Sequence, residues 1–473
     1  MKKKLLPALI VTGLIILVVI IMGITALINK YTPTKKTEDL KEYFNISSDD
    51  EAALIVDNEL SDYKAKIIDK KIYVDYKFVH DSLNSRFYWD ANENVLLYTT
   101  ASDIISAAAD SNSYSVTKQT NDFGYPIVKA TSDSALIALD YVKQYSNITF
   151  KSYDDPARIV ITSKWDEIDS ATVSKSTQVR VKGGIKSPIL KEVKKDDKIT
   201  ILDSGDKWDK VATEDGVIGY IKRKALSESK KTKLTNPDYE EETFTHIKKD
   251  KDICLAWNQV TSQSANSKVP QVISSTKGIN VMSPTWFYLN DNNGNLADIA
   301  SKDYVSYCHS QGIEVWGLFS NFENTDVDAA YVLTHTSTRT TLINQIMSAA
   351  FNYELDGVNI DFENITEAAY GDSYIEFIRE LSIKCHNNGI SLSVDVTVPA
   401  SFNKFFNRSD MANFADYIVI MGYDEHYKGS DAGSVSSIPW VTEGVESTLK
   451  EVPADQIILG MPFYTRIWEL TPK

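Results

Sequence analysis

The sequence predicts an α/β protein whose C-terminal half is a TIM (β/α)8 barrel, preceded by a small β-barrel, an α+β stalk and an N-terminal transmembrane helix. Three observations support this. From residue 245 onward, apolar strands alternate with helix-like segments. Residues 168–227 form short β-type runs separated by turn residues. Residues 5–28 carry no charge.

The uncharged run 5–28 is long enough to cross a membrane. A helix rises 1.5 Å per residue, and the hydrocarbon core is about 30 Å thick. Three lysines, Lys2 to Lys4, precede the run, which predicts a cytoplasmic tip and an extracellular remainder. A cleaved signal peptide is the alternative, although the run is longer than usual and no A-x-A-like site closes it. We therefore expect residues 1–28 to anchor the chain in the cell membrane as a single-pass protein.

Residues 29–40 are polar and predict a linker. Residues 41–165 show the order strand, helix, hairpin twice, which indicates a small α+β domain. This pattern resembles the stalk domains named after the N-terminal domain of copper amine oxidases. It contains no metal-ligand cluster, so a spacer is the favoured interpretation.

Residues 168–227 contain six candidate strands, and Asp215-Gly216 is a hairpin signal between the last two. The segment resembles a bacterial SH3 domain through Gly205-Asp206, Trp208 and Gly219-Tyr220-Ile221, although Gln178 stands where that family has Asn. The resemblance implies that the module grips peptidoglycan; a purely structural barrel is the alternative. Residues 228–244 are charged, contain Pro237 and predict a second linker.

Seven apolar strands are expected in residues 245–473, with helices between them. A series of βα units with apolar strands predicts a parallel barrel. Closure needs an eighth unit, so we expect the barrel to be incomplete at its C-terminus. The expected strands are 253–260, 279–289, 313–319, 357–362, 390–398, 417–421 and 457–462.

The fourth of these strands, within residues 356–363, delivers acidic groups to one place. Because side chains alternate along a strand, Asn359, Asp361 and Glu363 share one face. Burying such groups is costly unless they have a function. Asp356 has the opposite parity to Glu363, so it is expected to give structural support at the base of the strand.

Functional groups of a TIM barrel lie at the carboxyl ends of its strands. This rule selects further candidates on the fifth, sixth and seventh strands. Aromatic residues on the first three strands are candidate sugar-binding faces, with ordinary packing as the alternative for each. The candidates selected in this way are Asp395, Tyr423, Asp424, Tyr464 and Arg466, together with Trp257, Trp286 and Trp316.

The octapeptide 356–363 resembles the D-G-x-D-x-D-x-E signature of glycoside hydrolase family 18, the chitinase-like enzymes. Residues 421–424 (Met-Gly-Tyr-Asp) and 460–464 (Gly-Met-Pro-Phe-Tyr) also fit this family in order and spacing. The closest similarity in character is to the spore-cortex and cell-wall N-acetylglucosaminidases, and it covers residues 245–473.

This resemblance implies a role for each matching residue. Glu363 protonates the glycosidic oxygen, and the substrate's own 2-acetamido oxygen is the nucleophile, as in the substrate-assisted exception to two-carboxylate catalysis. Asp361 orients the acetamido nitrogen, Tyr423 donates a hydrogen bond to the acetamido oxygen, and Asp424 helps to bind the sugar. Asn359 replaces an aspartate of the family, which predicts altered proton tuning. No metal or cofactor is required.

The sequence therefore predicts a membrane-anchored extracellular glycosidase. Its expected partner is a peptidoglycan or chitin-like glycan, cleaved at β-1,4 bonds of N-acetylglucosamine. A chitinase-like lectin or a wall scaffold without catalysis is the alternative, although lectins of this family usually lose the acid that Glu363 supplies. The net charge of −15 argues against nucleic acid as a partner. Three scattered cysteines predict no disulfide framework or zinc site. The oligomeric state stays open.

Overall fold

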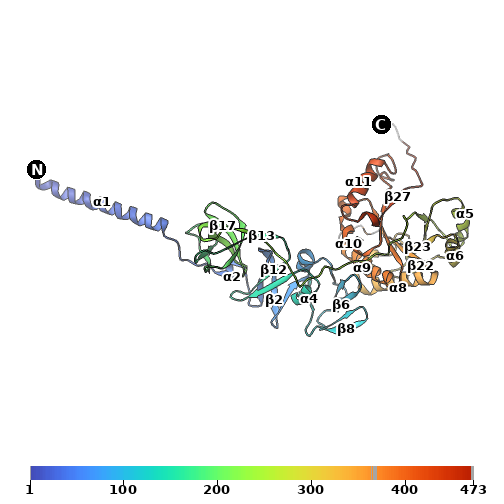
Figure 1. The fold of residues 1–473 in the computed structure, drawn as a ribbon, viewed down its shortest axis with the longest axis horizontal. Coiled ribbons are helices and arrows are strands. Elements are labelled where there is room, and N and C mark those ends of the chain that lie inside the picture. The colour runs from blue at the N-terminus through green and yellow to red at the C-terminus, as the bar shows by residue number, and fades with distance from the viewer. Residues whose placement is uncertain (1, 364, 366–369, 470–473) are drawn as a thin grey trace. The chain divides into compact units, whose positions relative to one another are not determined.

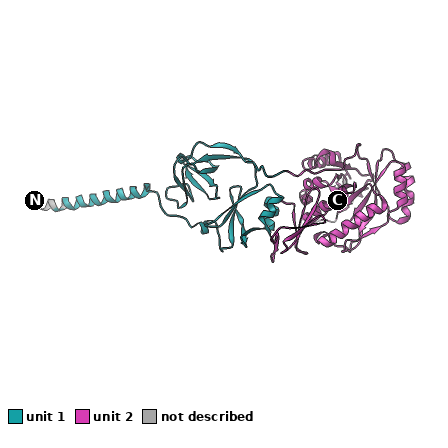
Figure 2. Ribbon diagram, turned by 60° about the horizontal axis from the view of Figure 1, so that its bottom comes forward, with its two compact units in different colours: residues 1–83, 136–240 teal, residues 84–135, 241–473 magenta. Residues whose placement is uncertain are grey.

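The computed structural model describes residues 2–363, 365 and 370–469. The chain divides into two compact units, residues 1–83 with 136–240 and residues 84–135 with 241–473 (Figure 2). We call them unit 1 and unit 2. The range 41–165, predicted as one stalk domain, is thus divided between the two units.

Unit 1 begins with α1 (Lys2–Tyr31), which contains a span at Leu9–Tyr31 long and apolar enough to cross a membrane. A signal sequence passes the same test of length and composition. The apolar side chains of this span are exposed along the helix. Unpaired apolar surface of this extent favours a lipid or translocon environment over water.

Two β-sheets form the rest of unit 1 (Figure 1). In the first, β1 (Glu51–Val56) pairs in parallel with β12 (Arg158–Thr162) and antiparallel with β2 (Glu59–Ile68). It also contains β3 (Lys71–Asp75), β10 (Ala135–Ala138) and β11 (Thr149–Tyr153), with helix α4 at Leu139–Gln144. The apolar run 135–141, whose sequence predicts a helix, therefore begins as strand β10 and becomes helical only from Leu139.

The second sheet of unit 1 is an antiparallel arrangement of seven strands in which all six β runs expected in 168–227 are strands. Apolar residues of both sheets share one core, in which Ile55 of β1 and Val211 of β17 are fully buried. The strands are β13 (Glu167–Thr172), β14 (Thr177–Arg180), β15 (Ile189–Val193), β16 (Lys198–Asp203), β17 (Trp208–Thr213), β18 (Ile218–Lys222) and β19 (Lys230–Lys233).

Unit 2 contains the seven parallel strands that the sequence predicts, in sequential order. Their apolar side chains form the largest core of the chain. The strands are β20 (Leu255–Asn258), β21 (Val281–Leu289), β23 (Glu314–Ser320), β24 (Gly357–Asp361), β25 (Ser391–Thr397), β26 (Tyr417–Met421) and β27 (Ile457–Gly460), with the short β22 (Leu296–Asp298) paired to β21.

Helices connect these strands and cover the sheet. Contacts join α6 (Lys302–Ser310) to β23, α8 (Thr336–Tyr353) to β24 and α9 (Gly371–His386) to β25 (Figure 1). Further α-helices described in this region are α5 (Val269–Ser274), α7 (Ala329–Thr334), α10 (Arg408–Phe414) and α11 (Ile438–Thr448). The pattern is the βα repeat of a TIM-type barrel.

A five-stranded antiparallel sheet from residues 84–135 completes unit 2 by packing on α8 and α9. Buried Asp90 accepts hydrogen bonds from the backbone N–H and the hydroxyl of Thr336, at 2.7 and 2.6 Å. Thr99 donates to Glu376 at 2.8 Å. The strands are β4 (Phe87–Asp90), β5 (Val95–Thr99), β6 (Ile104–Ala108), β7 (Ser113–Val116) and β8 (Gln119–Asp122).

Candidate functional site

Strand β24 has the alternation expected from the sequence. Val358 and Ile360 are fully buried in the apolar core, and Phe362 stacks on Phe377 of α9 with ring centroids 5.4 Å apart. Asn359 points to the other side and is also fully buried. Asp361 ends the strand. The apolar face thus fixes the strand so that the polar face lies inside the barrel.

Asn359 lies at the centre of a closed set of hydrogen bonds. Its side-chain oxygen accepts from the Trp257 indole and the Ser283 hydroxyl, each at 3.0 Å. Its side-chain nitrogen donates to Ser393 at 3.0 Å and to Asp395 at 2.8 Å. An amide can make two donor and two acceptor contacts of this kind, so its hydrogen-bonding capacity is filled.

Several carboxylates gather at the carboxyl ends of the strands. Burial, and then the charges of Asp395, Glu363 and Glu323, raise the pKa of Asp361 well above its ordinary value. Burial raises the pKa of Asp395 to about 8, while contacts with Asn359 and Trp257 oppose the rise. Carboxyl groups that lie close together cannot all ionise freely.

Glu363 follows the strand and is solvent-exposed, in contrast to Asp361 and Asp395. Partial burial of its carboxyl group, followed by the charges of Asp424 and Glu323, raises its pKa. A carboxyl group that is accessible to substrate and has a raised pKa can act as a general acid near neutral pH.

Tyr423 supplies a hydroxyl group to the same region. Its ring lies edge-on to Trp257 and to Tyr464, each with centroids 6.1 Å apart. Burial and the surrounding carboxylates raise its pKa, so the hydroxyl stays protonated and available as a donor. Asp424, next in the chain, accepts a hydrogen bond from Tyr464 at 2.7 Å and pairs with Arg466. One polar cluster beside Trp257 is therefore formed by Tyr423, Asp424, Tyr464 and Arg466.

Two of the predicted sugar-binding tryptophans have another role. Trp286 is fully buried, donates to Asn266 at 2.8 Å and packs against Tyr304. Trp316 is fully buried and stacks on Tyr417 with centroids 5.5 Å apart. Neither ring has a face open to a sugar, so this part of the prediction is wrong. Trp257 is only half-buried and touches the polar cluster.

Asp356 supports the amino end of β24, as its parity suggested. One of its oxygens accepts from the Val315 backbone N–H and contacts the His309 ring, each at 2.8 Å. These bonds tie the entry of β24 to β23 and α6. Asp356 is thus remote from the carboxyl end where Glu363 lies.

Two residues of the cluster were not predicted from the sequence. Glu323 follows β23 and accepts a hydrogen bond from Ser320 at 2.6 Å, while its charge acts on Asp361 and Glu363. Ser283 of β21 holds the Asn359 oxygen. The rule that selected Asp395 could have found Glu323, because it lies three residues after a strand end.

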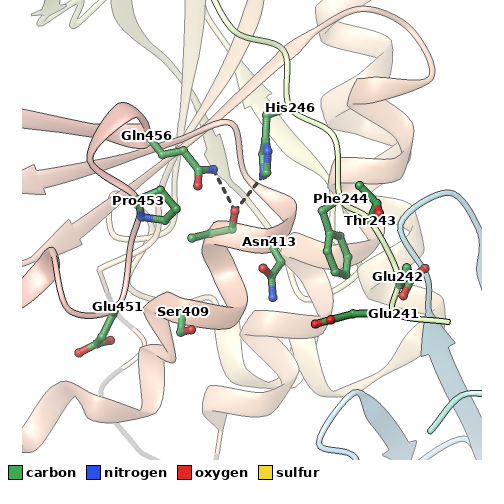
Figure 3. A pocket seen from close by; sticks show the side chains of 11 residues that line it. Glu241, Glu242, Thr243, Phe244, His246, Ser409, Asn413, Glu451, Pro453 and Gln456 are labelled. Carbon is green, nitrogen blue, oxygen red and sulfur yellow. Dashed lines mark hydrogen bonds between the residues drawn. The ribbon is translucent and has the colours of Figure 1, made fainter. Parts of the chain in front are cut away.

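A separate cavity of about 540 Å³ lies near the amino ends of β26 and β27 (Figure 3). His246 and Gln456 each donate to the Ala412 carbonyl at 2.9 Å there. Because it lies away from the carboxyl ends, this cavity is distinct from the acidic cluster. Within the residues that the structure describes, no group of three or more His, Cys, Asp or Glu side chains is arranged to hold a metal ion.

The structure thus places an acidic cluster and a tyrosine at the carboxyl edge of a parallel βα sheet of the TIM type, the edge at which such scaffolds hold their active sites. Residues 316–473 match the model of glycosyl hydrolases family 18, and the chain carries a domain of that family.

Curated relatives agree with this assignment. The chain is 25% identical over 194 residues to the "Uncharacterized glycosylase YvbX" of Bacillus subtilis, covering 38% of this chain and 55% of that protein. It is 32% identical over 141 residues to the "Putative sporulation-specific glycosylase YdhD" of the same organism, covering 29% and 33%. The chain therefore spans about half the length, or less, of these relatives.

A solved structure, the C-terminal domain of a putative chitinase from Desulfitobacterium hafniense, aligns with a TM-score of 0.41 at 20% identity. The alignment covers 45% of this chain and 66% of that one.

Proposed function

We propose that unit 2 hydrolyses β-1,4 glycosidic bonds at N-acetylglucosamine in peptidoglycan or a chitin-like glycan, with retention of configuration. The observation that carries this proposal is the placement of Glu363. It is a reachable acid with a raised pKa, next to Asp361 and in a cluster with Tyr423. Relatives named "Cortical fragment-lytic enzyme" in Bacillus subtilis and Bacillus anthracis favour peptidoglycan fragments as the substrate.

In the proposed reaction, protonated Glu363 gives its proton to the glycosidic oxygen as the bond breaks. The substrate's acetamido oxygen attacks the anomeric carbon and forms an oxazolinium ion, while the ionised form of Asp361 accepts a hydrogen bond from the acetamido N–H. Tyr423 donates to the acetamido oxygen and orients it for attack. Glu363, now ionised, takes a proton from the water that opens the ring. Positioned donors and charges of this kind contribute most of their stabilisation in the transition state.

The remaining cluster members are proposed to bind and hold the sugar. Trp257 offers the half-buried aromatic face, and Asp424, fixed by Tyr464 and Arg466, offers a carboxylate oxygen to a sugar hydroxyl.

Unit 1 is proposed to keep the enzyme at the cell surface. Helix α1 is the anchor, with the following residues outside the cell. The bacterial SH3-like segment 168–227 is the candidate wall-binding module, and it has thirteen Lys and Arg against nine Asp and Glu. A cavity of about 480 Å³ on it is lined by Trp208, three lysines, Arg223 and one acid, Asp206, with Lys222 over the Trp208 ring. Tethering raises the local concentration of wall glycan.

The proposal is tested with the full chain in detergent, supplied with chito-oligosaccharides and with cortex peptidoglycan fragments. Release of reducing ends by the wild type, and a loss of about 10³-fold or more in Glu363→Gln, is expected for a general acid. Asp303→Asn, which changes an exposed acid on α6, is the matched control and should retain full turnover. Glycan binding without any release of reducing ends would show that the chain is a lectin instead.

A further inference from the structure

A carboxylate that family 18 has at position 359 is an amide here, yet the cluster contains an additional buried acid one strand away. We propose that Asp395 takes the place of the missing carboxylate and shares one proton with Asp361, so that it is a positioning residue for the reaction. This inference rests on the proposed function, and it assigns Asp395 a role different from sugar binding.

The register of the sheet places the two acids side by side. Asn359 pairs with Ser393, and Ile360 pairs with Val394, in the parallel ladder of β24 and β25. The next positions are Asp361 and Asp395, which have the same parity. Neighbouring strands lie roughly 4.8 Å apart, so two side chains at this level and on one face are neighbours. Asp395 is 4% exposed.

The hydrogen bonds of Asn359 determine where a proton on Asp395 can lie. An indole N–H only donates, so the atom of Asn359 that faces Trp257 is its oxygen, and the NH₂ group faces Asp395. The Asp395 oxygen bonded to that NH₂ group is therefore an acceptor. A proton on Asp395 is best placed on the other oxygen, because the carbonyl oxygen of a carboxylic acid is the stronger acceptor. The Oδ1 atom of Asp361 is buried and has no hydrogen-bond partner among the described residues.

Electrostatics agree with a shared proton. Burial raises the pKa of Asp395 to about 8, and burial followed by the charge of Asp395 raises the pKa of Asp361. Two carboxyl groups forced together in a dry site retain one proton between them. The other titratable groups that act on this pair are Glu363, Glu323, Tyr374 and Tyr423.

The proton balance of the step is simple. In the free enzyme, the pair holds one proton. When the acetamido N–H arrives, Asp361 leaves the proton on Asp395 and accepts the substrate's hydrogen bond as an anion. On product release, the proton returns, and none is lost to solvent. An anionic Asp361 at that moment stabilises the positive oxazolinium ion, whereas two ionised acids would repel each other.

The test compares four forms of the full chain: wild type, Asp395→Asn, Asn359→Asp and the double variant that exchanges the two residues. Asn at 395 can still accept the hydrogen bond from Asn359, so the network is kept. We expect Asp395→Asn to lower kcat roughly 10²-fold with little change in KM, and to shift the pH profile. The exchanged variant should recover at least about 10-fold of this loss, since it restores a carboxylate beside Asp361. Wild-type kcat and pH profile in Asp395→Asn would overturn the proposal.

An infrared difference titration separates failure of this inference from failure of the proposed function. The wild type should show a protonated carboxyl band that disappears between pH 7 and 9, and Asp395→Asn should change the pH at which this band disappears, whether or not the chain cleaves glycan. Asp303→Asn should retain the band. Absence of the band in the wild type would refute the shared proton, even if turnover is normal. A band without turnover would refute the glycosidase proposal alone.

Discussion

Replacing Arg339, which does not belong to the acidic cluster, should destabilise unit 2 strongly. The Arg339 side chain is fully buried on α8 and pairs with Glu380 of α9, whose side chain is 5% exposed. Its guanidinium donates to Glu380 at 2.8 and 3.1 Å, and to the Leu333 carbonyl at 2.6 Å. In Arg339→Met, the Glu380 charge and the Leu333 carbonyl lose these partners.

The expected cost follows from the burial. Removing one member of a buried ion pair typically costs about 3–5 kcal/mol, because the remaining charge is uncompensated. Replacing both members with apolar residues costs far less, so Arg339→Met/Glu380→Leu should recover most of the loss. The loss in Arg339→Met should also shrink as pH falls, since Glu380 without its partner can take up a proton.

Urea unfolding followed by tryptophan fluorescence measures this cycle. Six of the eight tryptophans lie in unit 2, so the signal reports mainly on this unit. Equal losses in the single and double variants would contradict the reasoning, because they would show that shape and not charge pairing determines the stability of the α8–α9 contact.

Three further predictions concern the acidic cluster. The pKa of Asp395 is about 8 in the folded chain against an ordinary 3.8, so the folded state binds more protons in this range and its stability falls as pH rises from about 4 to 8. Between pH 5 and pH 8, the free energy of unfolding of Asp395→Asn in urea should rise relative to that of the wild type by up to about 4 kcal/mol. A difference between the two proteins that does not change with pH would contradict the raised pKa of Asp395. Tyr423→Phe should lower kcat about 10²–10³-fold while its ring packing keeps the fold; unchanged turnover would remove Tyr423 from the mechanism. A Cβ at Gly460 would lie 2.8 Å from the Trp257 ring, so Gly460→Ala should displace Trp257 and lower kcat, whereas Gly184→Ala, with open space around it, should not; equal kcat values would contradict the packing argument.

The seven strands of unit 2 could be predicted because apolar runs of strand length recur between helical segments. The site at their carboxyl ends followed from topology, which brings Asp361, Asp395 and Tyr423 to one edge whatever the details of packing. These features depend on the spacing of apolar residues and on the order of the strands along the chain, and both can be read directly from the sequence.

The errors at Trp286 and Trp316 have a different physical origin. Strands of a parallel barrel are buried on both faces, so the pattern does not tell which face a tryptophan occupies. The β21–β23 register shifts between Thr285 and Phe287, which places Trp286 at an irregularity. Trp316 pairs with Gly357, the first residue of β24, and therefore lies at the amino end of that strand.

The packing of residues 84–135 on the rest of unit 2 could not be predicted from the sequence either. Its contacts are buried polar pairs such as Asp90 with Thr336 and Thr99 with Glu376, and residues of these types are usually exposed. Only the folded chain shows that they meet. The same holds for Asp395 and Asn359, whose hydrogen bond joins positions 36 residues apart.

The central claim, that Glu363 supplies the proton to the leaving group, is tested most directly by varying the leaving group. Glu363→Gln should lose about 10³-fold or more on a chito-oligosaccharide, whose sugar alcohol needs protonation. It should lose far less on the matching 4-nitrophenyl glycoside, whose phenolate leaves without a proton. An equal loss on both substrates would contradict the assignment of Glu363 as the acid.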